Sequence, residues 1–284
     1  MTEQELRLKS VQYRKKILEI IHRAKAGHTG GSLSCIDILN VLYNHVMNVS
    51  PENFSDPNRD RYIQSKGHSV EALYTILADR GFFSVEALNT LGQYGSWFIG
   101  HPTRKVPGIE HNTGALGHGL SVSVGLALAA KTDGRSYRVF TLLGDGELTE
   151  GSNWEASMAA AHYRLDNLVV IVDRNGLQIT GSTEQVMRLE SLADRFKAFG
   201  YAIRVCNGND VADLVRTFAE LPFELGKPSL IIANTIKGKG VSFIENQVKW
   251  HHRVPTTEEL TCALEELEGA EMQLKASDDG TRQT

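Results

Sequence analysis

The chain has 284 residues, 41% of them hydrophobic and 23% charged, and a formal net charge of −4. These values are ordinary for a globular protein of one large or two small domains, and they argue against nucleic acid or an anionic membrane as the main partner. No apolar run approaches the roughly 20 residues of a membrane span, and the start, MTEQELRLKS, lacks a signal-peptide core. Three widely spaced cysteines predict free thiols in a reducing compartment, so we expect a cytoplasmic protein.

The first half of the chain is predicted to be mainly helical. Apolar residues at helical spacing predict helices over 3–26, 34–47, 70–80, 84–91 and 116–131. Residues 48–61 and 92–113 are predicted loops, and a loop as long as the second usually has a function.

In the second half, short β-branched runs alternate with helical segments. The strands are predicted over 138–143, 168–172, 201–205 and 229–234, and the helices between them over 150–162, 191–199 and 210–220. This alternation predicts an α/β fold with a doubly wound, mostly parallel sheet and helices on both faces. A last helix over 256–268 starts in capping-box style, and about fifteen final residues are predicted to form a flexible tail.

The stretch TLLGDGELTE places glycines and acids directly after a predicted strand. Ligands of open parallel sheets sit at the carboxyl ends of the strands, and the start of the following helix favours an anion such as phosphate. A carboxylate at Asp145 would repel phosphate unless a divalent cation lay between them. The Gly144-Asp145-Gly146 turn therefore predicts a diphosphate held by a metal ion, with Asp145 as a ligand of that ion.

A second oxygen ligand is expected at the end of the next strand. There the sequence VDRNGLQ offers the side-chain amide oxygen of Asn175 and the backbone carbonyls that follow it. Mg²⁺ takes a few protein oxygens of this kind and completes its shell with phosphate and water. Either turn alone also fits an ordinary tight turn, but the pair, separated by one helix, favours the metal–diphosphate interpretation.

Four of the ten histidines directly follow a glycine: His28, His68, His101 and His118. A preceding glycine lets the backbone approach a ligand that the imidazole also reaches, and loops and helix starts are where binding residues concentrate. Solvated loop histidines are the ordinary alternative. A zinc cluster is disfavoured, because no pair has HxxxH or HExxH spacing.

The GDG turn, followed thirty residues later by Asn175, is the signature of thiamine diphosphate enzymes. More narrowly, GDGELTEGSNWEA, LDNLVVIVDRNGLQITG and TIKGKGVSF resemble the amino-terminal, diphosphate-binding part of transketolases. The resemblance runs from about residue 5 to 255. It implies a thiamine diphosphate-binding domain over 1–255, followed by a C-terminal helix and flexible tail over 256–284. A complete transketolase is more than twice as long, so the resemblance implies one subunit of a split enzyme.

The resemblance also implies an activity and partners. A transketolase is a transferase that moves a two-carbon ketol unit from a ketose phosphate to an aldose phosphate with thiamine diphosphate and Mg²⁺, for which Ca²⁺ is an alternative. The cofactor carries the difficult chemistry, and the protein supplies orientation, metal anchoring and proton transfer. The expected partner carries the pyrimidine-binding and C-terminal domains in an α₂β₂ assembly, and this chain alone is expected to be inactive.

Individual motifs imply roles for individual residues. AGHTGGSLS implies that His28 faces the reacting hydroxyls of the substrate, and GHPTR that His101 contacts the hydroxyl on the terminal carbon of the donor. SKGHSVEALY places His68 beside the cofactor phosphate. TGALGHGLS implies that Gly114 and the Leu116 backbone contact the cofactor.

Other assignments are less direct. His118 stands in the cofactor loop where many single-chain transketolases have glutamine, and its role is left open. In KWHHRVP, His251 matches a residue that touches phosphate and substrate, but His252 replaces a usual glycine, so the choice between the two stays open. Leu177 is the expected third metal ligand, and Glu150 matches an acid near the subunit interface, although a helix-start acid is the plain alternative.

Four other functions fit parts of this pattern. Asp145 and Asn175 alone also permit the alpha chain of a 2-oxo-acid dehydrogenase or half of a deoxyxylulose-phosphate synthase; the histidine set favours a transketolase, because sugar hydroxyls need such partners. A transketolase-like enzyme for a branched or unusual pentulose phosphate in carbohydrate catabolism stays open. A non-catalytic binding module is disfavoured, because the metal ligands and histidines are all in place.

Overall fold

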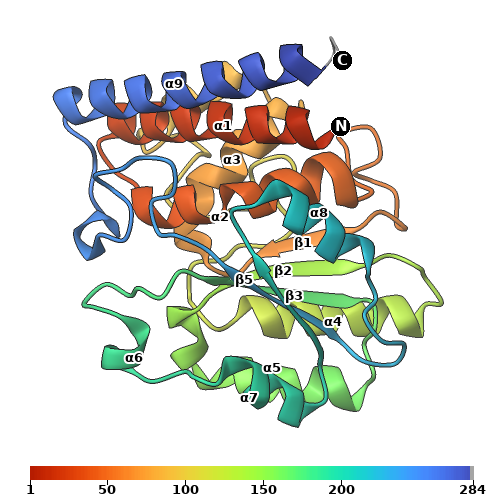
Figure 1. Ribbon diagram of the computed structural model, residues 1–284. Coiled ribbons are helices and arrows are strands. Elements are labelled where there is room, and N and C mark those ends of the chain that lie inside the picture. The colour runs from red at the N-terminus through yellow and green to blue at the C-terminus, as the bar shows by residue number, and fades with distance from the viewer. Residues whose placement is uncertain (282–284) are drawn as a thin grey trace.

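Five parallel strands form one sheet at the centre of the structure, a computed structural model that describes residues 1–281 (Figure 1). Their order is β1-β2-β3-β5-β4, and every neighbouring pair is parallel. The strands are β1 (Arg61–Gln64), β2 (Val139–Gly144), β3 (Leu168–Arg174), β4 (Ala202–Asn207) and β5 (Ser229–Asn234).

Helices cover both faces of this sheet, as expected for the doubly wound α/β fold (Figure 1). One face carries α4 (Gly119–Thr132), α5 (Gly151–His162) and α7 (Leu192–Phe199), and the other carries α2 (Thr29–Val41), α3 (Val70–Asp79) and α8 (Val211–Ala219). An outer layer is formed by α1 (Glu3–Ala24) and α9 (Thr257–Thr281), and α6 (Thr183–Val186) is a single turn. Short 3₁₀ turns are Gly67–Ser69, Val85–Thr90, Gly146–Thr149 and Val248–Trp250, and Leu42–Val46 is a π-helical turn.

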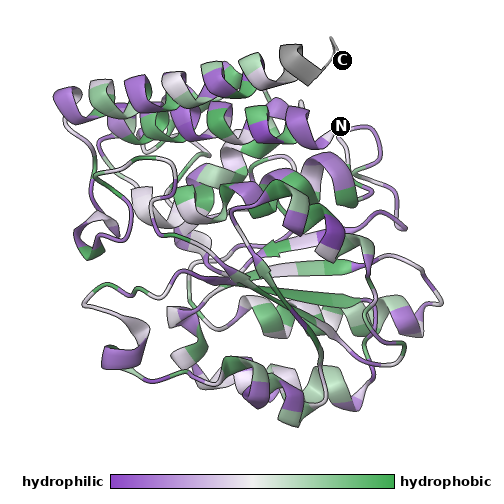
Figure 2. Cartoon of the chain, viewed as in Figure 1, coloured by the Kyte–Doolittle hydropathy of each residue, from purple (hydrophilic) through white to green (hydrophobic). Residues whose placement is uncertain are grey.

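The central strands are apolar on both sides, because each side faces a helical layer. Successive side chains of a strand point to opposite faces, so Phe140 and Leu142 of β2 join the core beneath α2 and α3, whereas Val139 and Leu143 join the core beneath α4 and α5. In Figure 2 hydrophobic residues accordingly gather along the strands and on the helix faces turned toward them.

Strand β1 was not predicted from the sequence. Its four residues, RYIQ, are too few for a periodic signal, and it forms because residues 61–64 pair in register with residues 139–142 of β2. The strand has a functional consequence, since it delivers Lys66 and His68 to the carboxyl edge of the sheet.

Several helix bounds also differ from the prediction. Helix α2 begins at Thr29 rather than at Ser34, because its glycine-rich first turn packs closely in the interior, and the segment expected to be helical over 84–91 is a 3₁₀ turn. The predicted flexible tail is wrong up to Thr281, since α9 continues along α1 and Lys15 pairs with Glu271 at 2.7 Å. Residues 282–284 of that tail lie outside the described residues. No helix within 1–281 is both long and apolar enough to span a membrane.

Candidate functional site

A cavity of about 290 Å³ opens at the carboxyl edge of the sheet, where strands β2 and β3 end. Ligands are expected at this edge of an open parallel sheet. Most of the predicted site residues line it: His28, His68, Gly114, Leu116, Gly144, Asp145, Gly146, Asn175, Leu177 and His251.

Asp145 is the buried acid of the GDG turn. Its carboxylate is 2% exposed and accepts hydrogen bonds from the Gly146 amide at 2.8 Å, the Gly176 amide at 2.6 Å and Arg174 at 3.1 Å. Burial, followed by the nearby Asp173 carboxylate, raises the pKa of Asp145. Because Oδ1 accepts only one of these bonds, it keeps a lone pair for a cation.

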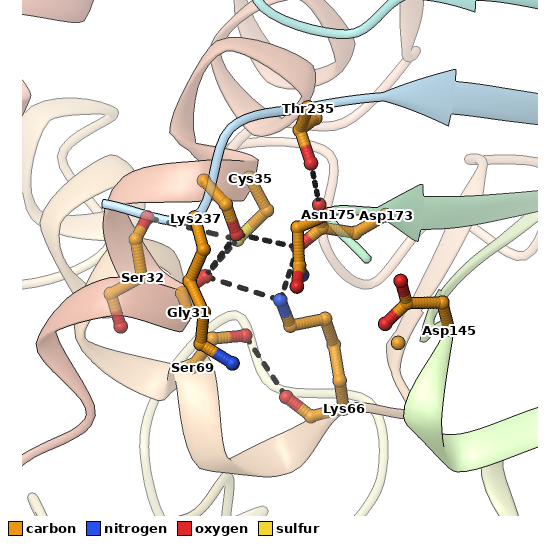
Figure 3. Close-up of polar contacts among 12 residues, drawn as sticks. Gly31, Ser32, Cys35, Lys66, Ser69, Asp145, Asp173, Asn175, Thr235 and Lys237 are labelled. Carbon is orange, nitrogen blue, oxygen red and sulfur yellow. Dashed lines mark hydrogen bonds and ion pairs between the residues drawn. The ribbon is translucent and has the colours of Figure 1, made fainter. Parts of the chain in front are cut away.

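Asn175 and Leu177 line the same cavity as Asp145. The Asn175 side-chain oxygen accepts the Leu177 amide at 3.1 Å, and Figure 3 shows the Asp145 and Asn175 side chains turned toward a common space. No group of three or more His, Cys, Asp or Glu within residues 1–281 is arranged to hold a metal. A cation here would therefore have few protein ligands and need oxygens from a bound ligand, as Mg²⁺ does with diphosphates.

Two lysines that the sequence analysis did not single out also line the cavity. Lys66 is buried; its ammonium donates to the Asp173 carboxylate and, at 3.1 Å, to the Gly31 carbonyl, and Thr235 also donates to Asp173 (Figure 3). The hydroxyl of Ser34 donates to the same carboxylate at 2.6 Å. Burial alone would lower the pKa of Lys66, but the Asp173 carboxylate reverses this and raises it.

Lys237 is the second of these lysines. Its ammonium donates to the Leu177 carbonyl at 3.1 Å and lies 2.8 Å from His251 Nδ1. Burial and the charge of Lys66 lower the pKa of Lys237 to about 8. In the sequence, only their positions within motifs could have indicated these lysines: Lys66 stands in SKGH and Lys237 in TIKGKG.

Five histidine rings, from four segments far apart in the chain, form a cluster with His28 at its centre. The centroid of the His28 ring lies 5.2 Å from that of His68, 6.3 Å from His101, 5.7 Å from His251 and 4.5 Å from His252. Of the last pair, His251 lines the cavity and His252 is exposed beside His28, so both belong to this histidine cluster.

Four rings of the cluster, those of His28, His68, His101 and His251, have a lowered pKa and are therefore uncharged at neutral pH. Burial, with the neighbouring histidines and lysines, lowers the pKa of His28 to about 4 and that of His251 to about 3. His28 Nδ1 is buried and has no hydrogen-bond partner. A neutral imidazole both donates and accepts, so an unpartnered ring atom beside the cavity suits a ligand hydroxyl.

The buried acid Glu147, to which the sequence analysis gave no role, joins two parts of the site. Its carboxylate accepts the Gly117 amide at 2.9 Å and the Gly144 amide at 3.0 Å, which fastens the loop bearing Gly114 and Leu116 to the GDG turn. Because the ring of the exposed His118 turns back to the Leu116 carbonyl at 3.1 Å, it does not line the cavity.

Glu150 is not brought into the cavity either. It is exposed and precedes α5 as its N-cap residue, without a side-chain capping bond. Its predicted place near a subunit interface stays a prediction.

The residues present fit an anionic ligand held with a cation. Lys66 and Lys237 supply positive charge, Asp145 and Asn175 supply oxygens, and the buried Nε2 of Gln178 is a donor without a partner that lines the same cavity. Buried polar groups without partners are uncommon in folded proteins, so Gln178 and His28 suit a ligand that offers acceptor and hydroxyl groups.

Known proteins resemble the chain along almost its full length. The family described as transketolase, thiamine diphosphate binding domain, matches residues 8–272. A Phocaeicola vulgatus protein described as one subunit of an apulose-4-phosphate transketolase is 51% identical over 99% of this chain and 100% of its own. A Clostridium protein described as a 6-deoxy-6-sulfo-D-fructose transketolase subunit is 41% identical over 94% of this chain and 98% of its own.

A solved structure shares the architecture. Campylobacter jejuni transketolase superposes with a TM-score of 0.89 at 30% identity, over 96% of this chain and 46% of that one, so the chain spans about half the length of this solved transketolase. The resemblance inferred from GDGELTEGSNWEA and its companion motifs is confirmed by these matches. The chain belongs to the transketolase family, as its thiamine diphosphate-binding part.

Proposed function

We propose that this chain is the thiamine diphosphate-binding subunit of a two-subunit transketolase, a transferase of two-carbon ketol units between sugar phosphates. The observation that carries the proposal is one cavity in which Asp145 and Asn175 stand beside the histidine cluster. The first pair suits a cation and a diphosphate, and the histidines suit the hydroxyls of a sugar.

Asp145, Asn175 and the Leu177 carbonyl would hold Mg²⁺, and Lys237, His68 and Gln178 would face the diphosphate. When bound, thiamine diphosphate supplies the carbanion chemistry that breaks and forms carbon–carbon bonds beside a carbonyl. His28, His101 and His251 would bind the sugar hydroxyls and move their protons, for which neutral imidazoles are suited. Gly114 and the Leu116 backbone would enclose the other end of the cofactor.

The partner would carry the pyrimidine-binding and C-terminal domains, in a heterotetramer with two copies of each chain. Two facts support a partner: the similar Phocaeicola protein is described as one subunit of its transketolase, and the chain spans about half the length of a solved transketolase. We place the complex in the cytoplasm, in keeping with the free thiols of Cys35 and Cys206 and with phosphorylated substrates.

For the donor we propose a ketose phosphate outside the common pentose phosphates, with apulose 4-phosphate first, because the relative described by that sugar is 51% identical over its whole length. A ketose with a sulfonate in place of a phosphate, sulfofructose, is the second candidate, from the relative that is 41% identical.

Co-expression with a candidate partner subunit tests the proposal. The purified complex, supplied with thiamine diphosphate and Mg²⁺, is assayed with apulose 4-phosphate, sulfofructose and xylulose 5-phosphate as donors and glyceraldehyde 3-phosphate or ribose 5-phosphate as acceptors. We expect transfer by the complex and none by this chain alone. Appreciable turnover by the chain alone would refute the two-subunit proposal, and a complex that is active only on xylulose 5-phosphate would refute the proposed donor.

A further inference from the structure

Glu71 is a buried carboxyl directly beneath the histidine cluster. It lies in the first turn of α3, three residues after His68, and is 1% exposed. None of the ion pairs within residues 1–281 includes it. Instead both of its oxygens accept hydrogen bonds from the start of α2: Oε1 from the backbone N–H of His28 at 3.2 Å and Oε2 from the Ser32 hydroxyl at 2.8 Å.

These bonds replace a cap that α2 does not make for itself. His28 is the N-cap residue of α2, and its side chain makes no capping bond; its ring lies instead among the other histidines. An acid near a helix N-terminus interacts favourably with the exposed amides and the helix dipole. Glu71 occupies this place for α2 and also lies in the first turn of α3. Burial raises the pKa of Glu71 to about 7, even though the Ser32 and His28 bonds oppose the shift.

Gly27 shows how closely the backbone approaches this carboxyl. Its φ is +151°, and a Cβ built there would lie 2.7 Å from Glu71 Oε1 and 2.8 Å from Ile21. A side chain at position 27 would therefore push the carboxyl away, so glycine is required for the contact between Glu71 and the His28 amide.

We propose that Glu71 is a positioning residue for His28: its carboxyl fixes the backbone from which the His28 ring projects and ties it to the turn that carries His68. Its consequence for catalysis rests on the proposed function, in which His28 meets the substrate hydroxyls. Displacement of a group that orients substrate by about 1 Å can cost roughly 100-fold in rate. Cofactor binding should be much less affected, because Glu71 contacts none of Asp145, Asn175 and Lys237.

The first test measures the contact itself. Amide hydrogen exchange of His28 is followed in the chain carrying Glu71→Ala or Glu71→Gln, with Asp79→Asn as the control. Asp79 is at the other end of α3 and accepts bonds from Lys9 and Tyr13. We expect His28 to exchange about 5-fold faster with alanine, because a hydrogen bond is lost, and to stay near the wild-type rate with glutamine, which keeps an acceptor oxygen.

The second test uses the reconstituted complex. Glu71→Ala is expected to lower kcat/KM for the donor about 10- to 100-fold, with the apparent affinity for thiamine diphosphate within about twofold, and Glu71→Gln is expected to restore most of the activity. If Glu71→Ala fails to fold, Glu71→Asp takes its place, because the shorter side chain draws the carboxyl back from His28. We expect a smaller loss of kcat/KM, again with little change in the affinity for thiamine diphosphate.

The outcomes separate the two proposals. Unchanged His28 exchange and unchanged kcat/KM in every folded variant would overturn the role of Glu71. Faster exchange in Glu71→Ala, with no sugar transfer by the wild-type complex, would support the contact and overturn the proposed function.

Discussion

The ammonium of Lys66 and the carboxylate of Asp173 form a buried ion pair at the floor of the cavity, with side chains 1% and 0% exposed. The pair joins the turn after β1 to the end of β3, and Thr235 after β5 also donates to the same carboxylate (Figure 3). A further bond to this carboxylate comes from Ser34 of α2. Three strand ends and one helix thus meet at one buried charge, which fixes the floor of the site.

Breaking this pair should be costly. Lys66→Met leaves the Asp173 charge buried without a cation, and loss of one partner of a buried pair typically costs about 3–5 kcal/mol. Urea unfolding of the purified chain measures the change. The control is Lys227→Met. The ion pair between Lys227 and Glu224 is exposed and should contribute less than about 1 kcal/mol to the free energy of unfolding. Equal effects of the two substitutions would contradict the structural role of Lys66.

Asp145→Asn should abolish metal-dependent cofactor binding while the chain stays folded. The asparagine amide is similar in shape to the carboxylate but carries no charge for the cation. Replacing a residue that only supports a metal ligand typically lowers metal affinity roughly 10- to 100-fold, and replacing the ligand itself should lower it further. Calorimetry of the reconstituted complex with thiamine diphosphate and Mg²⁺ measures the affinity for the cofactor. Asp133→Asn, an exposed acid at the end of α4, is the control; an affinity unchanged by Asp145→Asn would exclude Asp145 as a ligand.

Glu147→Ala should loosen the loop that carries Gly114 and Leu116. The Gly117 and Gly144 amides would lose their acceptor, and a buried donor left without a partner costs about 1–3 kcal/mol. We expect the free energy of unfolding to fall by about 2–4 kcal/mol, with faster amide exchange over 114–118. Glu155→Ala on α5 is the exposed control, and a loop as protected as in the wild type would rule out the role of Glu147.

The stability that the neutral histidines contribute should be lost as the pH drops below about 6.5, the ordinary pKa of histidine, whereas the raised pKa of Glu71 acts in the opposite direction. The pKa of His28 is lowered to about 4 and that of His251 to about 3, so between these values and 6.5 the unfolded chain binds protons that the folded chain does not. Stability is then present above pH 6.5 and lost toward pH 4. Denaturant unfolding from pH 7 to 5 measures the loss.

Replacing His28 and His251 together by asparagine should flatten this dependence, with a melting temperature at pH 5 at least about 2 °C closer to the pH 7 value than in the wild type. His118→Asn, outside the cavity, serves as the control. A double variant with the same pH dependence as the wild type would show that the cluster does not couple protonation to folding.

The meeting of Asp145 and Asn175 at one edge of the sheet could be predicted because the rule behind it is local. Asp145 and Asn175 each follow a recognisable apolar strand, and parallel strands bring their carboxyl ends to one edge of a sheet. Glu71 and Lys66 could not be found in this way. The strand before Lys66 is too short to recognise, and the partner of Glu71 is an amide 43 positions away in the chain.

The sequence by itself determined the alternation of strands and helices, the acid and amide at two strand ends, and the family to which the chain belongs, because each depends on neighbouring residues. Only the tertiary structure decided which buried charges lie beneath the site and how five histidines from four distant segments meet at His28. The reason is physical: the cost of burying Lys66, Asp173 and Glu71 is offset by partners that come close only when strand β1 and helices α2 and α3 have packed.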